Sequence, residues 1–151
     1  MPIFENEMIN QTIEIDAPAA EVFALLKDID NWSSWVRGVS KSYAISSGDW
    51  RVGYKIAFRT NMAPLTLAPL TIQEYEEGRV MEWGVRTPVF TMGHRFELTD
   101  LGSGRCRLLQ REYSHGLLGY LTKPANGLIF KFDSAWAEDL LAYFGAKSRA
   151  A

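Results

Sequence analysis

The residues of this sequence best suited to chemistry are His94, Gln110, Glu112 and Asp133. An imidazole beside a carboxyl group can move a proton on a bound molecule, and an amide can orient the oxygens of that molecule. The alternation of polar and apolar residues along two predicted strands places His94, Gln110 and Glu112 on the apolar faces of those strands. A helical wheel places Asp133 inside an apolar arc, where an unpaired charge is costly to bury. The four groups together predict a mainly apolar pocket with a few orienting polar side chains.

These polar residues also have purely structural interpretations. His94 is compatible with a core histidine hydrogen-bonded to its neighbours, and Glu112 with a strand end near water or an ion pair. Asp133 is compatible with a carboxylate stabilised near the positive end of a helix. The hypothesis of a catalytic pair, His94 with Glu112, therefore competes with a structural role for each residue.

Other kinds of reactive site are not predicted. The sequence has two histidines and one cysteine with no closely spaced ligand pair, so we predict no metal site, and nothing predicts a cofactor. Gly102, Ser103 and Gly104 lack the lysine and helix that follow in a phosphate-binding loop, and they predict a turn. Cys106 is predicted to be buried and inert, because alternation points the flanking arginines away from it.

The element expected to carry Asp133 is a long amphipathic helix over residues 124–146. Its apolar arc contains Ile129, Phe132, Trp136, Leu140, Tyr143 and Phe144. A helix with so aromatic a face requires a large apolar partner surface, and the rest of the chain has to supply it.

The remaining pattern predicts a curved antiparallel sheet. A strand over residues 8–15 is followed by a helix beginning at Pro18 and a second short helix near Trp32 and Trp35. Short alternating segments separated by turn residues then predict six strands, over residues 39–45, 52–60, 70–76, 79–86, 91–101 and 105–114. This order predicts an α+β fold in which about seven strands wrap around the C-terminal helix.

One connection contains a near-duplicate, APLTL at 63–67 followed by APLTI at 68–72. Its prolines, Pro64 and Pro69, argue against a central strand, which favours a rigid edge turn. The alternative is an apolar flap that gates a cavity.

The expected cavity lies between the inward face of the sheet and the helix. Strand alternation and the helical wheel predict that the following residues line it: Trp35, Tyr54, Phe58, Trp83, His94, Phe96, Gln110, Glu112, Phe132, Asp133 and Trp136. The tryptophans among them are equally well explained as core residues. Tyr113 is expected to point outward.

Composition limits the classes of partner. The 151 residues are 47% hydrophobic with a net charge of −2, which predicts one compact domain over residues 1–151 with a substantial core. No basic run predicts nucleic-acid binding, and no apolar run is long enough for integral membrane association. A single cysteine and the lack of a signal-like N-terminus favour a cytoplasmic location.

Two stretches resemble a known superfamily. The segment IDAPAAEVFALLKDIDNWSSW at 15–35 resembles the opening of the START-like, or Bet v 1-like, helix-grip proteins, which are often grouped with polyketide cyclases and dehydratases. The segment GHRFELTDLGSGRCRLLQREYSHGLLGYL at 93–121 is similar to the last hairpin of these proteins and its crossing into the C-terminal helix. The resemblance implies a deep apolar pocket that relatives use for lipids, hormones, aromatic polyketides or quinones. Many relatives are not enzymes, so the resemblance indicates the fold far better than a reaction.

Three functions remain open at this point. The first is a binding protein that holds a small hydrophobic ligand, with His94, Gln110, Glu112 and Asp133 orienting the oxygens of that ligand. The second is a cyclase or dehydratase in which His94 and Glu112 act as acid and base on a polyketide-like substrate. The third is an interaction module whose interior is filled by side chains and whose outer face binds a protein.

Overall fold

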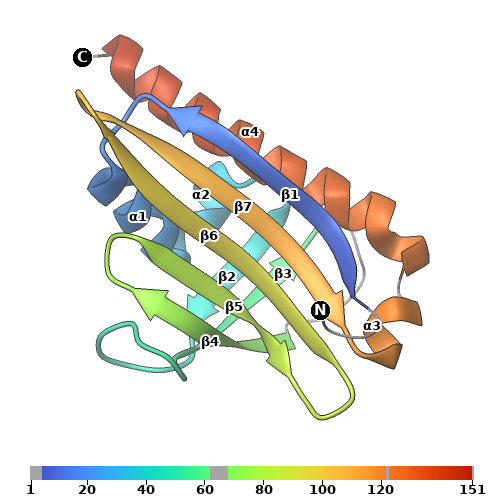
Figure 1. Ribbon diagram of the computed structural model, residues 1–151. Coiled ribbons are helices and arrows are strands. Elements are labelled where there is room, and N and C mark those ends of the chain that lie inside the picture. The colour runs from blue at the N-terminus through green and yellow to red at the C-terminus, as the bar shows by residue number, and fades with distance from the viewer. Residues whose placement is uncertain (1–4, 62–67, 122, 151) are drawn as a thin grey trace.

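Seven strands form one antiparallel sheet in the order β1-β7-β6-β5-β4-β3-β2 (Figure 1). The structure is a computed structural model that describes residues 5–61, 68–121 and 123–150. The strands are β1 (Asn6–Ile15), β2 (Val39–Ala44), β3 (Lys55–Thr60), β4 (Ala68–Glu76), β5 (Val80–Arg86), β6 (Thr91–Gly102) and β7 (Arg105–His115). The prediction of an antiparallel α+β sheet is confirmed. Strands β2 to β7 pair in sequence order, and β1 adds to the outer edge of β7.

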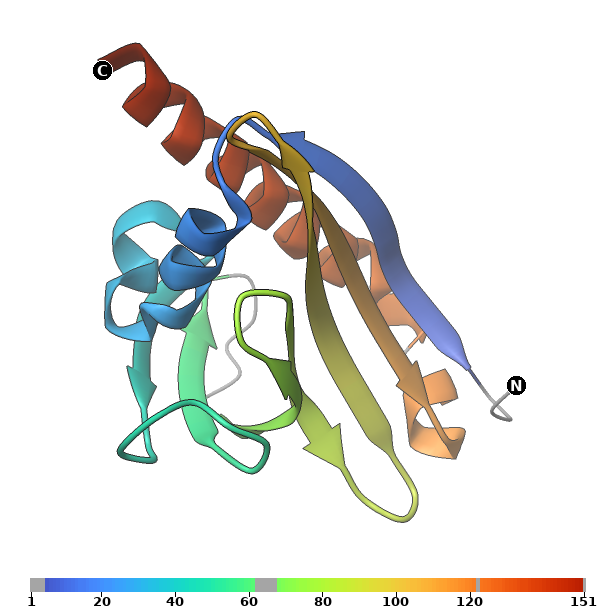
Figure 2. The same ribbon diagram turned by 60° about the vertical axis from the view of Figure 1, so that its left-hand side comes forward.

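The helices lie on one side of this sheet. They are α1 (Ala19–Lys27), a 3-10 turn (Ile29–Asn31), α2 (Trp32–Trp35), α3 (Leu117–Leu121), a second 3-10 turn (Lys123–Ala125) and α4 (Asn126–Ala150). The 25 residues of α4 run diagonally across the sheet, with α1 and α2 near its C-terminal half (Figure 2). This is the expected helix-grip arrangement. No helix in the described ranges is long and apolar enough to cross a bilayer.

Two details of the helices differ from the sequence prediction. Helix α3 was not predicted, because its five residues have almost no polar member to set a helical period. Tyr143 was placed in the apolar arc of α4, but its side chain is 40% exposed. Tyr143 borders the surface groove between α4 and α1, whereas Leu140 and Phe144 of the same arc are buried.

Only the second half of the repeated segment can be compared with the prediction, because residues 62–67 lie outside the described ranges. Strand β4 begins at Ala68, so Pro69 belongs to a strand that lies between two others. Pro69 pairs with Ala57 of β3, whereas pairing with β5 begins only at Thr71. The missing N–H of Pro69 therefore interrupts no pairing with β5, which explains why a proline is tolerated here.

The core between sheet and helices is built from aromatic rings. Trp32, Trp83 and Trp136 are fully buried, and the ring centroids of Trp32 lie 5.1 Å from both of the other tryptophans. Phe58 and Phe132 stack beside them at 6.4 Å. Strand and helix thus meet through edge and stacked ring contacts, which favour a fixed packing.

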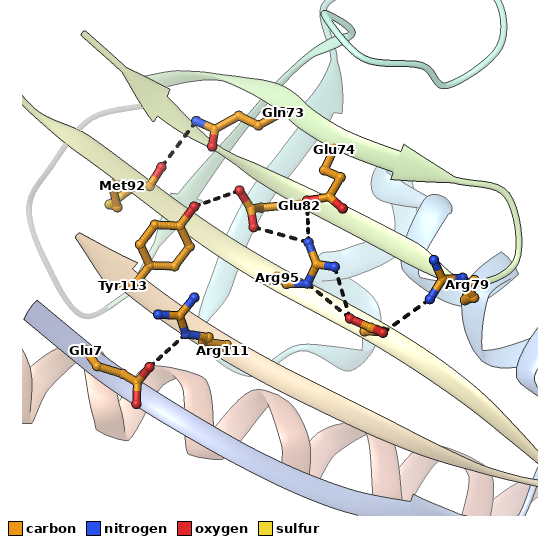
Figure 3. A network of polar contacts seen from close by, with 10 residues as sticks. Glu7, Gln73, Glu74, Arg79, Glu82, Met92, Arg95, Arg111 and Tyr113 are labelled. Atoms are coloured by element: carbon orange, nitrogen blue, oxygen red, sulfur yellow. Dashed lines mark hydrogen bonds and ion pairs between the residues drawn. The ribbon is translucent and has the colours of Figure 1, made fainter. Parts of the chain in front are cut away.

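The opposite face of the sheet carries a network of charges (Figure 3). Arg95 forms ion pairs with Glu74, Glu82 and Glu97, and the hydroxyl of Tyr113 donates to Glu82 at 2.9 Å. Tyr113 therefore points outward, as its strand position predicted. The charged groups in this network pair with one another, so a ligand site is expected in the interior.

Candidate functional site

His94 stands at the centre of the interior face of the sheet. In the strand pairing it lies between Trp83 of β5 and Glu112 of β7. The alternation that buries Phe96 also turns the His94 ring inward, where it is 2% exposed. The Nδ1 atom of the ring lies 3.6 Å from Oε2 of Glu112.

Asp133 approaches the same ring from the helix. It is fully buried on the face of α4 that packs on the sheet, and its Oδ1 lies 3.8 Å from Nε2 of His94. Neither oxygen of Asp133 accepts a hydrogen bond from a donor in the described parts of the chain. The structure therefore places Asp133 in the space shared by His94 and Glu112, and not in solvent at the helix start.

Gln110 fixes the orientation of the imidazole. Its Oε1 accepts a hydrogen bond of 2.8 Å from Nε2 of Gln11 on β1, which leaves its amide nitrogen facing Nε2 of His94 at 3.1 Å. In this arrangement Nε2 of His94 is the acceptor, and the ring proton belongs on Nδ1, the nitrogen that faces Glu112. Gln11 lies on the same face of β1 as Ile9, Ile13 and Ile15, so the alternation of the sequence did contain a signal for it.

Burial controls the protonation of the three groups. It lowers the pKa of His94 to about 3, so the imidazole is neutral at pH 7. It also raises the pKa of Asp133, and the charge of Glu112 adds to this effect. The pKa of Glu112 is raised by burial as well, although the contact with Asp133 acts in the opposite direction. A neutral base thus lies beside a carboxyl group that retains its proton.

The same three residues could also hold a cation. One nitrogen or oxygen from each of His94, Glu112 and Asp133 lies within 4.8 Å of the others. Two carboxyl groups that face each other in an apolar interior require a proton or a cation between them. The sequence argument against a metal rested on ligand spacing along the chain, and it could not detect ligands brought together from two strands and a helix.

The walls around these groups are aromatic. The ring of His94 lies 4.7 Å from Phe96, 5.1 Å from Trp83 and 5.7 Å from Trp136, measured between centroids. Trp136 presents a buried Nε1 without a hydrogen-bond partner among the described groups, and so does Trp35. The interior therefore contains indole donors as well as carboxyl oxygens that protein groups leave unsatisfied.

Most side chains predicted to line a cavity meet in this one cluster, and they fill it. It contains Trp35, Phe58, Trp83, His94, Phe96, Gln110, Glu112, Phe132, Asp133 and Trp136. Tyr54 is buried in the same core, but its ring stacks on Trp50 at 5.1 Å and not on the rings around His94. Trp32 belongs to the cluster although it was predicted only as a core residue. Trp83, Phe96 and Trp136 are so completely buried that no space for water adjoins them.

A separate groove of about 280 Å³ lies on the surface between α1 and α4. Its walls are formed by Glu21 and Leu25 of α1 and by Asp28, the residue after this helix. On the other side it is lined by Tyr143 and Phe144 of α4. It does not include His94, Glu112 or Asp133, so it is distinct from the polar cluster.

Comparisons with known proteins agree with this architecture. A family profile described as polyketide cyclase / dehydrase and lipid transport matches residues 8–137. A START superfamily protein from Mycobacterium smegmatis is similar in structure, with a TM-score of 0.73 and 13% identity over 93% of this chain and 99% of the other. The Zhui aromatase/cyclase from a Streptomyces species also has a TM-score of 0.73, with 16% identity over 97% of both chains.

A plant enzyme has the same fold. Norcoclaurine synthase from Thalictrum flavum matches with a TM-score of 0.67 and 13% identity over 92% of this chain and 86% of its own. At these identities the structural matches establish the fold alone. A comparison with proteins of curated function finds no match.

Proposed function

Because the chain belongs to the polyketide cyclase / dehydrase and lipid transport family, we propose that it binds a small, largely hydrophobic molecule between α4 and the sheet. An oxygen of this molecule would lie at Asp133, with His94 and Glu112 beside it. The aromatic rings around His94 would contact the apolar part of the molecule, and burial of that part would supply most of the affinity.

The observation that carries this proposal is the fully buried Asp133 carboxyl group, whose oxygens accept no hydrogen bond within the described residues and face a second buried carboxyl group, that of Glu112. An unsatisfied buried polar group costs about 1–3 kcal/mol, so a packed core gains nothing from retaining it. A ligand oxygen can accept the proton of Asp133, and the unpaired Nε1 of Trp136 offers a second donor on the same helix. Both orphan groups would be satisfied by one bound molecule.

Binding has to open the interface, because aromatic side chains fill it in this structure. The rings that have to move belong to α4 and α2 on one side and to the sheet on the other. We therefore expect a ligand to displace α4 from the sheet or to rotate Phe132 and Trp136. Either movement changes the surroundings of buried tryptophans, which makes intrinsic fluorescence a direct readout.

The test uses two ligands of nearly equal shape, 2-acetylnaphthalene and 2-isopropenylnaphthalene, of which only the first has a carbonyl oxygen. The ketone should bind about tenfold more tightly to the wild type, as one additional hydrogen bond predicts. Asp133→Leu should remove this preference and retain binding of the hydrocarbon. Calorimetry and tryptophan quenching measure both affinities.

A control variant separates the interior from the surface groove. Leu25→Asp changes the groove between α1 and α4 and should leave both affinities unchanged. Loss of binding in Leu25→Asp but not in Asp133→Leu would place the ligand in the groove and contradict the proposal. Failure of both compounds to bind, with no small molecule detected by native mass spectrometry of the purified protein, would favour the interaction module.

The opposite protonation preferences of His94 and Asp133 favour a second candidate, a dehydratase or cyclase. Neutral His94 could remove a proton from the carbon next to a ketone through Nε2, which would exchange its hydrogen bond from Gln110 for the substrate, while protonated Asp133 donates its proton to a departing hydroxyl group, which leaves as water. The sequence hypothesis paired His94 with Glu112, and in this proposal Glu112 holds the ring in place through Nδ1.

A binding protein and an enzyme differ in turnover. For an aryl β-hydroxyketone, the enzyme hypothesis predicts loss of water, detected by the absorbance of the conjugated product. His94→Ala should lower kcat by at least about a hundredfold while the ketone still binds. Equal rates in wild type and His94→Ala would eliminate this candidate and leave ligand binding intact.

A further inference from the structure

Helix α3 (Leu117–Leu121) buries its glycine and exposes its leucines. Gly119 is buried against Ser114 and Phe90, and a Cβ atom on it would lie 2.9 Å from Oγ of Ser114. On a helical wheel Leu117 and Leu121 lie opposite Gly119, and Leu118 lies beside them. Leu117, Leu118 and Leu121 are 55%, 51% and 64% exposed, the reverse of the usual arrangement. We call these three residues the leucine face.

The leucine face is held in this orientation by buried hydrogen bonds. The backbone oxygen of Gly119 accepts from Nδ2 of Asn6 at 3.4 Å and from Oγ of Ser114 at 3.3 Å. Asn6 and Asn126 also exchange hydrogen bonds of 2.9 and 2.7 Å, which tie the start of α4 to β1. Rotating α3 to bury its leucines would break this network. The exposure of the leucines is therefore built into the fold.

Further apolar side chains extend the leucine face around one end of the molecule. The turn between β5 and β6 packs beside α3, since Gly116 lies against the backbone of Val89, and Val89 itself is exposed. Leu128 and Phe130 in the first turns of α4 are exposed as well. In Figure 1 this turn and α3 project at the end of the sheet where β1 begins.

The unpaired charges of this end are positive, since Glu5 and Glu7 at the start of β1 both pair with Arg111. From residue 83 to 96 and from 113 to 132 the sequence contains no aspartate or glutamate. The exposed charged side chains of these stretches are Arg86, Lys123 and Lys131. Lys123 lies over the ring of Tyr120 at 4.4 Å, so a cation and an amphipathic aromatic ring occur together at the rim. This combination of exposed leucines, an aromatic ring and basic residues is typical of surfaces that insert into an anionic bilayer.

We propose that this end of the molecule docks on anionic membranes, with the leucine face in the acyl region and Lys123 and Lys131 at the lipid headgroups. The basic side chains complement anionic headgroups, whereas a partner helix requires a groove, and the groove described above lies between α1 and α4 and includes none of these residues. Docking of a second copy on the same surface would bring the lysines of both copies together. The association is peripheral, and it does not depend on the proposed interior ligand.

Sedimentation of the purified full chain with vesicles tests the proposal. Vesicles of phosphatidylcholine with about 30% phosphatidylglycerol should bind the protein, and pure phosphatidylcholine should bind it at least about tenfold more weakly. The double variant Leu118→Asp/Leu121→Asp should lose at least about tenfold in affinity. Val52→Asp is the matched control, because Val52 is 63% exposed but lies in the β2–β3 loop at the other end of the sheet.

A second variant keeps the test independent of any effect of aspartates on α3. Lys123→Glu/Lys131→Glu should weaken binding to the anionic vesicles and leave the thermal midpoint unchanged. No binding of the wild type, or equal binding of wild type and both double variants, would overturn the proposal. A concentration-dependent dimer that disappears in Leu118→Asp/Leu121→Asp, without vesicle binding, would also overturn it and identify a second copy as the occupant.

Discussion

The Asp133 carboxyl group lies where no basic side chain within the described residues compensates a negative charge, so the folded protein has to retain its proton. In the unfolded chain the pKa returns toward its ordinary value of 3.8. At neutral and basic pH the folded state therefore holds one more proton than the unfolded state, and stability falls as the pH rises. The slope reaches about 1.4 kcal/mol per pH unit for one proton.

Asp133→Asn should reduce this slope, and the slope that remains reports on Glu112, whose pKa is also raised by burial. Between about pH 7 and about pH 9 the free energy of unfolding of the wild type should decrease more steeply than that of Asp133→Asn. His94 does not interfere in this range, because it is neutral in both states above its ordinary pKa of 6.5. Urea titrations at several pH values measure the slopes.

The control for this titration is Glu138→Gln, which changes an exposed carboxylate of the same helix paired with Arg37. It should keep the slope of the wild type. A flat pH dependence of the wild type from about pH 7 to about pH 9 would show that Asp133 is ionised in the folded state, and the acid role proposed for it would then fail.

Gly84 determines how closely β5 approaches its neighbours. It pairs with Gly93 across β5 and β6, and a Cβ atom on it would lie 1.8 Å from the backbone oxygen of Met92. This space is used by Gln73, which reaches across β5 and donates to the same Met92 oxygen at 3.3 Å (Figure 3). Backbone cannot yield as a flexible side chain does, so the strands would have to move apart.

Gly84→Ala should therefore lower the free energy of unfolding by about 1–3 kcal/mol, the usual cost of overpacking. Gly127 of α4 has no heavy atom within 4 Å of its added Cβ. Gly127→Ala should stabilise the protein by about 0.5–1 kcal/mol through helix propensity. Chemical denaturation measures the free energy of unfolding of both variants. An equal change of this free energy in Gly84→Ala and Gly127→Ala would contradict the explanation given for Gly84.

Strand alternation predicted the elements and the inward residues well, because one face of the sheet is buried and a strand exposes every second residue to it. His94, Gln110 and Glu112 were found in this way. Alternation could not predict that Asp133 meets them, since the register between a helix and a sheet depends on packing along the whole interface. It also failed for α3, whose leucines follow neither the strand period nor the helix period. The packing of Gly119 and the exposure of its neighbours depend on residues that are distant in the sequence.

At the scale of the whole molecule, the interior and the leucine end are connected through α4. The helix starts beside α3, where Asn126 bonds Asn6, and two turns later it presents Phe132 and Asp133 to the sheet. A displacement of the first turns of α4 would therefore disturb both the leucine face and the aromatic cluster. The proposed opening of the interior requires that the core tolerate a guest molecule in place of its own side chains.

Removing Trp136 tests that tolerance. The side chain is fully buried and contacts the rings of Trp32, Phe58, Trp83, His94 and Phe132. Trp136→Ala should cost about 3–5 kcal/mol and leave an apolar cavity beside Asp133. Free indole has the shape of the missing side chain, and it should raise the thermal midpoint of Trp136→Ala but not that of the wild type.

Phe144→Ala provides the comparison, because Phe144 is a buried residue of the same helix that borders the surface groove far from His94. Indole should not stabilise it. If Trp136→Ala does not fold, Trp136→Val with the same additive supplies the measurement. If Trp136→Ala folds but indole does not raise its thermal midpoint, the core has collapsed around the missing side chain. A core that closes in this way could not open to hold a ligand between α4 and the sheet.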